Sequence, residues 1–142
     1  MPSNVARFEQ LMYLSIAIGV LGSALEWNQL VLRADPVGGA TFVFTVQGIV
    51  IASEITLIWL IARRRKNWAR WFALISFLVG IPFGISSYIE LFQNNALAGV
   101  LSTIQDLAQV VAFCLIFTGN ARDWFKPLRL EPEHPATSSI PR

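Results

Sequence analysis

Four long apolar runs, separated by short polar turns, constrain this chain more than any other feature. The runs cover residues about 11–32, 41–62, 71–92 and 96–118 of the 142-residue sequence. A helix needs about 20 mostly apolar residues to cross a hydrocarbon layer about 30 Å thick, and each run is long enough. We therefore expect an all-α integral membrane protein, with a four-transmembrane-helix bundle in a single membrane domain over residues 1–126.

Composition argues against an ordinary soluble domain. Apolar residues make up 54% of the chain and charged residues 14%, whereas soluble domains average roughly 25% charged residues. The chain therefore has too little polar surface to cover itself in water, and we expect lipid to cover it. The single cysteine, Cys114, excludes an internal disulfide, and nothing near it has metal-ligand spacing.

The basic residues predict the orientation of these spans. "RRRK" lies between the second and third runs, followed by Arg70. Short loops rich in Lys and Arg stay in the cytoplasm. With four spans, both termini are then cytoplasmic as well, and among all the Lys and Arg only Arg33 faces outward. We expect a multi-pass protein of the cell inner (plasma) membrane.

The same basic turn is expected to contact anionic lipid headgroups. It is too short and too close to the bilayer to favour nucleic acid as a partner. The residues assigned to this role are Arg63, Arg64, Arg65, Lys66 and Arg70.

The C-terminal tail and the first apolar run each carry a further sequence pattern. Residues 127–142 are rich in proline and have no apolar period, which predicts a disordered cytoplasmic tail. "GSA" at Gly22 to Ala24 resembles a signal-peptidase site, which would remove the first span. The preceding segment has only one Arg together with Glu9, and apolar residues resume after Trp27. These features favour an uncleaved span.

The two halves of the chain resemble each other. "SIAIG" at 15–19 matches "SFLVG" at 76–80, and "TVQ" at 45–47 matches "TIQ" at 103–105. Each half contains two spans, so a duplication would give two tandem parallel helical hairpins, related by an axis along the membrane normal. The alternative is a chance match between apolar segments built from few residue types.

Small residues follow one face of the first and third spans. Gly19 and Gly22 lie on the first face together with Ser15 and Ser23, and Gly80 and Gly84 lie on the other. Small residues let helix backbones approach closely in lipid, so we expect these two faces to pack against each other. Pro82 lies between the two glycines of the third span, and its missing N–H predicts a kink there.

Polar residues form stripes inside two of the spans. Ser102, Gln105, Asp106 and Gln109 recur at helical spacing, with Asp106 roughly 15 Å from the outer end and therefore close to the midplane. On the second span Gln47 and Glu54 share a face. The predicted intramembrane polar site comprises Asp106, Glu54, Gln105, Gln109, Gln47 and Ser102.

The acids allow more than one interpretation. No basic residue lies deep in a span to pair with Asp106 or Glu54, and an ionised carboxylate there costs about 2.5–3.5 kcal/mol. We expect these two to be protonated or to bind a cation. They would either line a pathway for a proton or cation, or hydrogen-bond to a neighbouring helix or subunit. Glu26 and Glu90 are outer-side acids near water, and Arg33 lies two turns beyond Glu26.

Sequence motifs for enzymatic chemistry are missing. The only histidine, His134, lies in the tail, and the chain has no Gly-rich phosphate loop and no GxSxG elbow. We expect no enzyme activity, no cofactor and no metal site. The function expected is a small accessory, assembly or interaction subunit that uses its polar face in a homo-oligomer or a larger complex. The alternative is a small proton- or cation-coupled transporter or channel acting as an oligomer.

Overall fold

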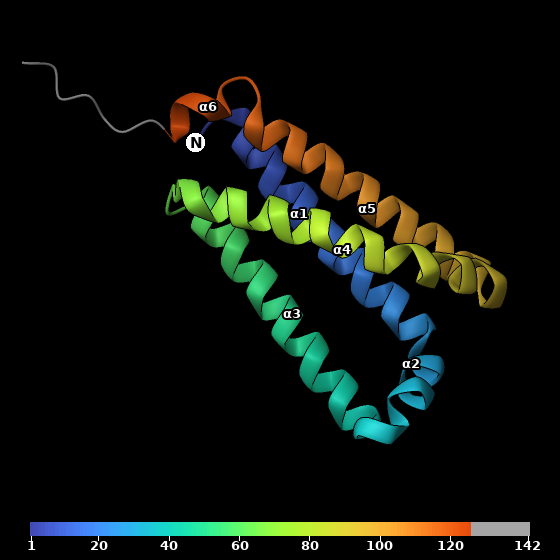
Figure 1. Ribbon diagram of the computed structural model, residues 1–142. Helices are drawn as coiled ribbons and strands as arrows, with labels where there is room; N and C mark the ends of the chain where they lie inside the picture. Colours follow the sequence, from blue (N-terminus) through green and yellow to red (C-terminus); the bar gives the residue numbers. More distant parts are fainter. Residues whose placement is uncertain (126–142) are drawn as a thin grey trace, which may run out of the picture.

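The computed structural model describes residues 1–125, without the side chains of residues 83–88 and 122–123. This part of the chain is built from helices and contains no strand (Figure 1). The predicted tail over residues 127–142 lies outside it. The elements are α1 (Ser3–Leu25), α2 (Trp27–Ala34), a 3₁₀ turn (Asp35–Val37), α3 (Gly39–Ala62), α4 (Asn67–Asn94), α5 (Ala96–Phe117) and α6 (Ala121–Trp124).

Three of these helices are long and apolar enough to cross a membrane, counting only described residues: α1, α3 and α5. They support a helical, membrane-embedded protein. Helix α4 covers the third apolar run, but the side chains at 83–88 within it fall outside the described part.

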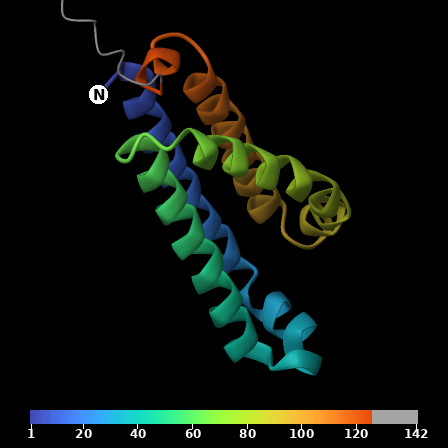
Figure 2. The ribbon, with the colours of Figure 1, turned by 60° about the vertical axis from the view of Figure 1, so that its left-hand side comes forward.

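The first helix differs from its predicted limits. It begins at Ser3 rather than near residue 11, and it ends at Leu25. At Glu26 the backbone leaves the helical conformation (φ −98°, ψ 10°), and the short amphipathic helix α2 follows. Trp27 packs against Phe44 of α3, with ring centroids 4.5 Å apart. Because α2 turns aside to lie on α3, its residues do not extend the first span (Figure 2).

The turn between α3 and α4 places a side chain in an unusual backbone conformation. Arg65 has φ 53°, in the left-handed region that normally favours glycine. Its Nε donates to the carbonyl oxygen of Trp124 at 2.8 Å. The basic turn is therefore bonded to α6, which holds the last helix at the same end of the molecule.

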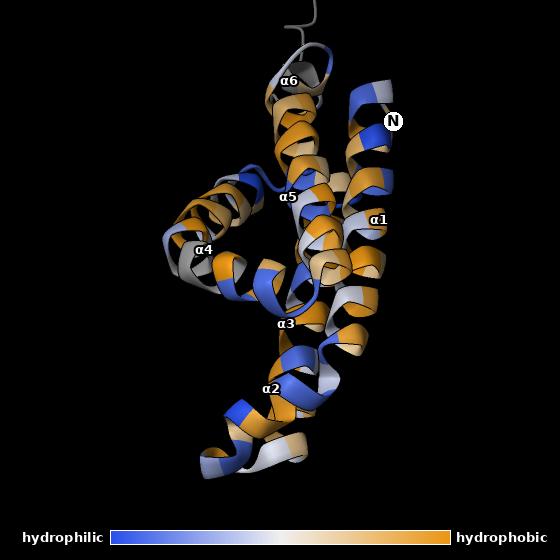
Figure 3. Ribbon diagram, turned by 90° about the vertical axis from the view of Figure 1, so that its right-hand side faces the viewer, coloured by the Kyte–Doolittle hydropathy of each residue, from blue (hydrophilic) through white to orange (hydrophobic). Residues whose placement is uncertain are grey.

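The helix neighbours also differ from the prediction. Helix α1 packs most extensively against α5 and next against α3, whereas α4 packs against α5 and α3. The predicted contact between the small-residue faces of α1 and α4 is not made by the described residues. On the same face of α1, Gly19 instead meets Gln105, Ser15 contacts Gln109 and Ser23 accepts a hydrogen bond from Gln47. Figure 3 shows α4 standing away from the stack of α1, α5 and α3.

The tightest packing lies at one end of the molecule. Val5, Phe8, Ile58, Ile61 and Ile116 are at most 1% exposed and belong to one cluster. The N-terminus, the α3–α4 turn and α6 all lie at this end (Figure 1). We call it the basic end, because it carries residues 63–66.

A clamp joins the start of α1 to the turn between α5 and α6 at the basic end. Asn4 Nδ2 donates to the Thr118 carbonyl at 3.2 Å, and Asn120 Nδ2 donates to Ser3 Oγ at 3.0 Å. Gly119 lies between Thr118 and Asn120 and has φ +56°. A Cβ at this position would come 2.9 Å from Asn4 Nδ2. A glycine is therefore required on both conformational and steric grounds.

Candidate functional site

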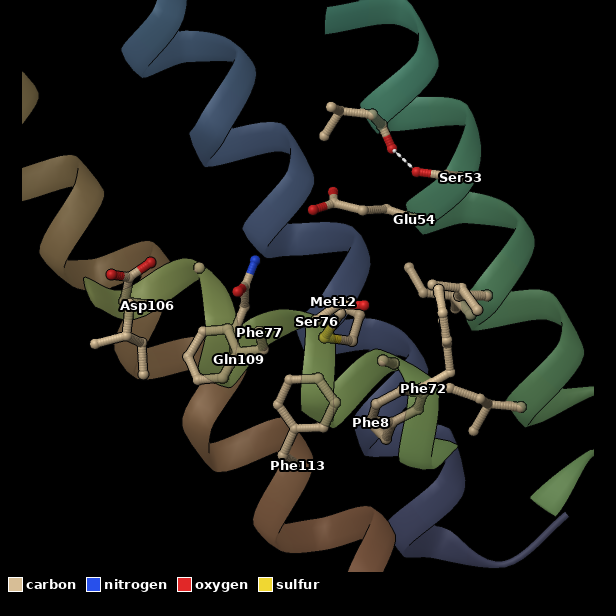
Figure 4. A pocket seen from close by; sticks show the side chains of 17 residues that line it. Phe8, Met12, Ser53, Glu54, Phe72, Ser76, Phe77, Asp106, Gln109 and Phe113 are labelled. Atoms are coloured by element: carbon tan, nitrogen blue, oxygen red, sulfur yellow. Dashed lines mark hydrogen bonds between the residues drawn. The ribbon is translucent and has the colours of Figure 1, made fainter. Parts of the chain in front are cut away.

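Two adjoining cavities lie among the long helices. The larger, of about 590 Å³, is lined by residues from α1, α3, α4 and α5 (Figure 4). The smaller, of about 250 Å³, lies towards Glu26 and α2. We call them the large and the small cavity.

The two central carboxylates reach the large cavity from different helices. Glu54 projects from α3, and Asp106 projects from α5 on the opposite side (Figure 4). Both side chains are partly buried. No Lys, Arg or His is present among the residues that line either cavity in the described chain. A positively charged ligand would therefore meet acidic and amide groups there without competing cations.

Gln109 fixes the contact between α5 and α1 beside these acids. It is only 8% exposed and lines the large cavity. Its Nε2 lies 3.4 Å from Ser15 Oγ, and the Ser15 hydroxyl donates to the Met12 carbonyl at 2.9 Å. Ser15 is fully buried, so its small side chain gives the amide both space and an acceptor.

The small cavity gathers the remaining predicted polar residues. Gln47, Ser102 and Gln105 line it, together with Glu26. Gln47 Nε2 donates to Ser23 Oγ at 2.7 Å, which joins α3 to α1. The structure thus distributes all six predicted intramembrane polar residues over the walls of two neighbouring cavities.

Glu54 is common to both cavities. It and Val50, one helical turn earlier on α3, line the large and the small cavity alike. The carboxylate of Glu54 is therefore the acidic group at their boundary.

The predicted packing residues differ in how closely other atoms approach them. A Cβ on Gly19 would lie 2.9 Å from the amide of Gln105, so this glycine allows a close approach of α1 and α5. Gly22 and Gly80 have nothing within 4 Å of such a Cβ, and each borders a cavity instead. Pro82 is exposed within a helix that continues past it. The surroundings of Gly84 lie outside the described residues.

The outer-side acids separate into two environments. Glu26 borders the small cavity, whereas Glu90 pairs with Arg33 at 2.8 Å. Both partners of that ion pair are more than half exposed, at 59% and 51%. Arg33 therefore contacts Glu90 of α4 rather than the sequence-nearer Glu26, and an ion pair so open to solvent contributes little to stability.

The basic residues of the α3–α4 turn also differ in their surroundings. Arg63 Nε pairs with Glu9 Oε1 at 3.1 Å. The Arg64 guanidinium lies 5.1 Å from the centroid of the Trp59 ring, and that of Arg65 lies 4.3 Å from the Trp124 ring.

Arg70 is held between two aromatic rings. Its guanidinium carbon lies 4.9 Å from the Phe117 ring centroid and 4.7 Å from that of Phe125. The side chain is only partly accessible, so Arg70 contributes to packing at the end of α5 more than to the exposed basic surface.

Sequence reasoning assigned no role to the clamp residues Ser3, Asn4, Gly119 and Asn120. The only local signal was the Gly-Asn pair after an apolar helix, which is typical of a helix C-terminus. Nothing local indicates that Asn4, more than a hundred positions earlier, is the partner.

Comparison with protein-family models, curated proteins and solved structures finds no match for this chain. In the described residues, no group of three or more His, Cys, Asp or Glu side chains is placed to hold a metal ion. The site is therefore interpreted from its own geometry.

Proposed function

We propose that the chain spans the inner membrane four times, with α4 as the remaining span and both termini in the cytoplasm. The grouping of the N-terminus, the basic turn and α6 at one end supports this orientation, because basic residues concentrate on the cytoplasmic side. Arg33, the outward-facing exception in this arrangement, lies in the last turn of α2, at the opposite end of α1 and α3.

Within this arrangement, we propose that the protein binds a small cation in the large cavity and passes it, or a proton, across the membrane. The observation that carries the proposal is the convergence of Glu54 and Asp106, from two helices, on one cavity. Among the described residues that line it, the charged side chains are these two acids. Carboxylates within membrane spans are rare, and they characteristically line ion pathways and proton relays. A cavity of about 590 Å³ lies within the usual size range for small-molecule sites.

In the proposed pathway, Glu54 connects the large cavity to the small cavity. A cation or proton at Asp106 reaches Glu54 through the large cavity, and the same carboxylate borders the small cavity near Glu26. At each carboxylate a proton and a cation compete for the same oxygens, so binding of one releases the other. This competition couples cation movement to proton movement in the opposite direction.

Flux through proteoliposomes tests this function. Asp106→Asn and Glu54→Gln keep the side-chain shapes but remove the charge, and each is expected to abolish proton-coupled cation flux under an imposed pH gradient. Glu90→Gln is the matched control, because Glu90 is an exposed outer acid in a surface ion pair. Wild-type flux in the two cavity variants would contradict the proposal, provided that all proteins insert to the same level.

A second function is favoured by the open side of the large cavity. Ser76, Gly80 and Ile81 of α4 line this cavity yet are exposed in a single copy of the chain. A helix of a second copy or of a larger membrane complex would cover that opening and hydrogen-bond to Asp106. The protein would then be an accessory or assembly subunit.

Purification from native membranes in mild detergent, with intact-mass detection, distinguishes the two functions. A stoichiometric partner that is lost in Asp106→Asn, together with no flux in the wild type, would support the subunit. Flux by the protein alone would support the carrier.

A further inference from the structure

We propose that the α3–α4 turn is a binding site for the phosphate of an anionic phospholipid, formed by Arg64, Arg65 and Lys66. The first observation is the exposure of all three side chains at one short turn. The second is the placement of Arg64 over the ring of Trp59, which is 46% exposed on the surface of α3. The site is independent of the cavities and of any flux through them.

The contact with Trp59 positions Arg64 for an anion. A guanidinium over the face of an aromatic ring is attracted by the ring without using its N–H donors, which can still bond to an anion. The Trp59 ring thereby limits the freedom of the Arg64 side chain without using its donors. A phosphate oxygen of a lipid beside α3 accepts hydrogen bonds of the geometry that Arg forms with phosphate.

The neighbouring basic residues of the turn differ in how their charge is compensated. Arg63 is 60% exposed but forms an ion pair with Glu9, and Arg70 lies between the Phe117 and Phe125 rings. Arg65 donates from Nε to the neutral carbonyl of Trp124, which leaves its charge and its terminal amino groups for another acceptor. Among the described basic side chains of this turn, residues 64–66 therefore offer uncompensated charge at an exposed surface.

Exposed tryptophans place this turn at the depth of lipid headgroups. Trp68 and Trp71, at the start of α4, are 57% and 49% exposed. Tryptophan is enriched at the membrane interface because its ring is apolar and its N–H is polar. Basic side chains at that depth attract anionic lipids. A lipid phosphate is therefore the ligand that the position and the charge together favour.

Thermal unfolding in lipid nanodiscs tests the site with a charge-matched control. The melting temperature is measured in phosphatidylcholine alone and with phosphatidylglycerol added, for wild type, Arg64→Gln/Lys66→Gln and Arg7→Gln/Arg63→Gln. Both double variants lose two positive charges at the same end. We expect phosphatidylglycerol to raise the melting temperature of wild type and of the control pair, and the Arg64/Lys66 variant to lose most of that rise.

Two outcomes would overturn the proposal. An equal loss of the lipid-dependent rise in both double variants would indicate a general charge effect rather than a site. A rise of the same size produced by inorganic phosphate, with phosphatidylcholine as the only lipid, would show that the ligand is a free anion. Each variant is compared with its own melting temperature in phosphatidylcholine, so any loss of intrinsic stability is separated from the lipid effect.

Discussion

The two ends of this molecule are built in contrasting ways. At the basic end, Phe8, Ile58 and Ile116 are buried almost completely, and a polar clamp ties α1 to the turn after α5. Towards α2, the walls of the small cavity and of the adjoining part of the large cavity carry acids and glutamines, whereas the apolar wall of the large cavity extends to Phe8, Ile58 and Ile61 at the basic end. The basic end is thus built from apolar side chains and a polar clamp, and the polar cavity walls lie further along the same helices.

The difference indicates a division of labour along the helices. In lipid, close packing rather than hydrophobic burial holds helices together, so a densely packed end can anchor a more open one. The basic end holds the helices together, and the part of the helices towards α2 is free to carry a site. Substitutions at the basic end are therefore expected to cost more stability than substitutions towards α2.

The largest loss of stability is expected for Phe8→Ala at the basic end. Phe8 is 0% exposed and lies 6.4 Å from Phe113, centroid to centroid, so truncation leaves a cavity and costs about 3 kcal/mol. The free energy of unfolding can be measured by SDS titration in mixed micelles. Phe42→Ala is the control, because Phe42 is 45% exposed on α3. Similar losses in both variants would show that the basic end is not the better packed region.

Gly119→Ala should be the next most damaging change. Alanine at φ +56° costs about 1–2 kcal/mol, and its Cβ would also meet Asn4 at 2.9 Å. Gly48→Ala, on α3, is the control, since a Cβ there meets nothing within 4 Å. That control should be neutral or slightly stabilising, because alanine is the better helix former. The same SDS titration measures the free energy of unfolding of both variants. An unchanged free energy of unfolding in Gly119→Ala would contradict the strain expected at this position of the clamp.

At the boundary between the two regions, Gly19→Ala should have a moderate effect. Its Cβ would crowd the Gln105 amide, but that amide is the end of a flexible side chain and can shift into the small cavity. We expect a loss of about 1 kcal/mol, similar to a small overpacking effect. Gly22→Ala, one turn on, has open space and should cost nothing. Identical unfolding curves for the two variants would contradict the close approach of α1 and α5.

The smallest effect is expected for Ser23→Ala at the open end. It removes the acceptor of the 2.7 Å hydrogen bond from Gln47, and interhelical hydrogen bonds in membranes average about 0.6 kcal/mol. Thr45→Ala is the control, because the Thr45 hydroxyl bonds within its own helix to Thr41. A loss comparable to that of Phe8→Ala would mean that the polar contacts, and not the packed end, hold the helices together.

The sequence predicted where the helices begin and end better than which helices pack against each other. The apolar runs and the basic turn located α3, α4 and α5 to within a few residues, because helix limits follow from local composition. The meeting of α1 with α5 could not be predicted in the same way. A face of small residues indicates that some backbone or long side chain approaches it, and Gly19 gives no sign that this is Gln105.

The end of the first helix was missed for a related reason. The apolar residues after Trp27 continue the composition of a span, but the contact between Trp27 and Phe44 directs them onto α3. For the candidate site, helical spacing grouped Ser102, Gln105, Asp106 and Gln109 on one stripe. The distribution of these side chains between two cavities depends on how α1 and α3 flank α5, which is tertiary information.

The pairing of α1 with α5 has a consequence for how the protein is made. Synthesis proceeds from the N-terminus, so α1 is made well before its most extensive neighbour, which begins at Ala96. Until then Ser15 and Gly19 lack the glutamines that they later accommodate. Completion of the fold is therefore a late event in translation, and a chain that stops before α5 leaves the ribosome without the partner that closes it.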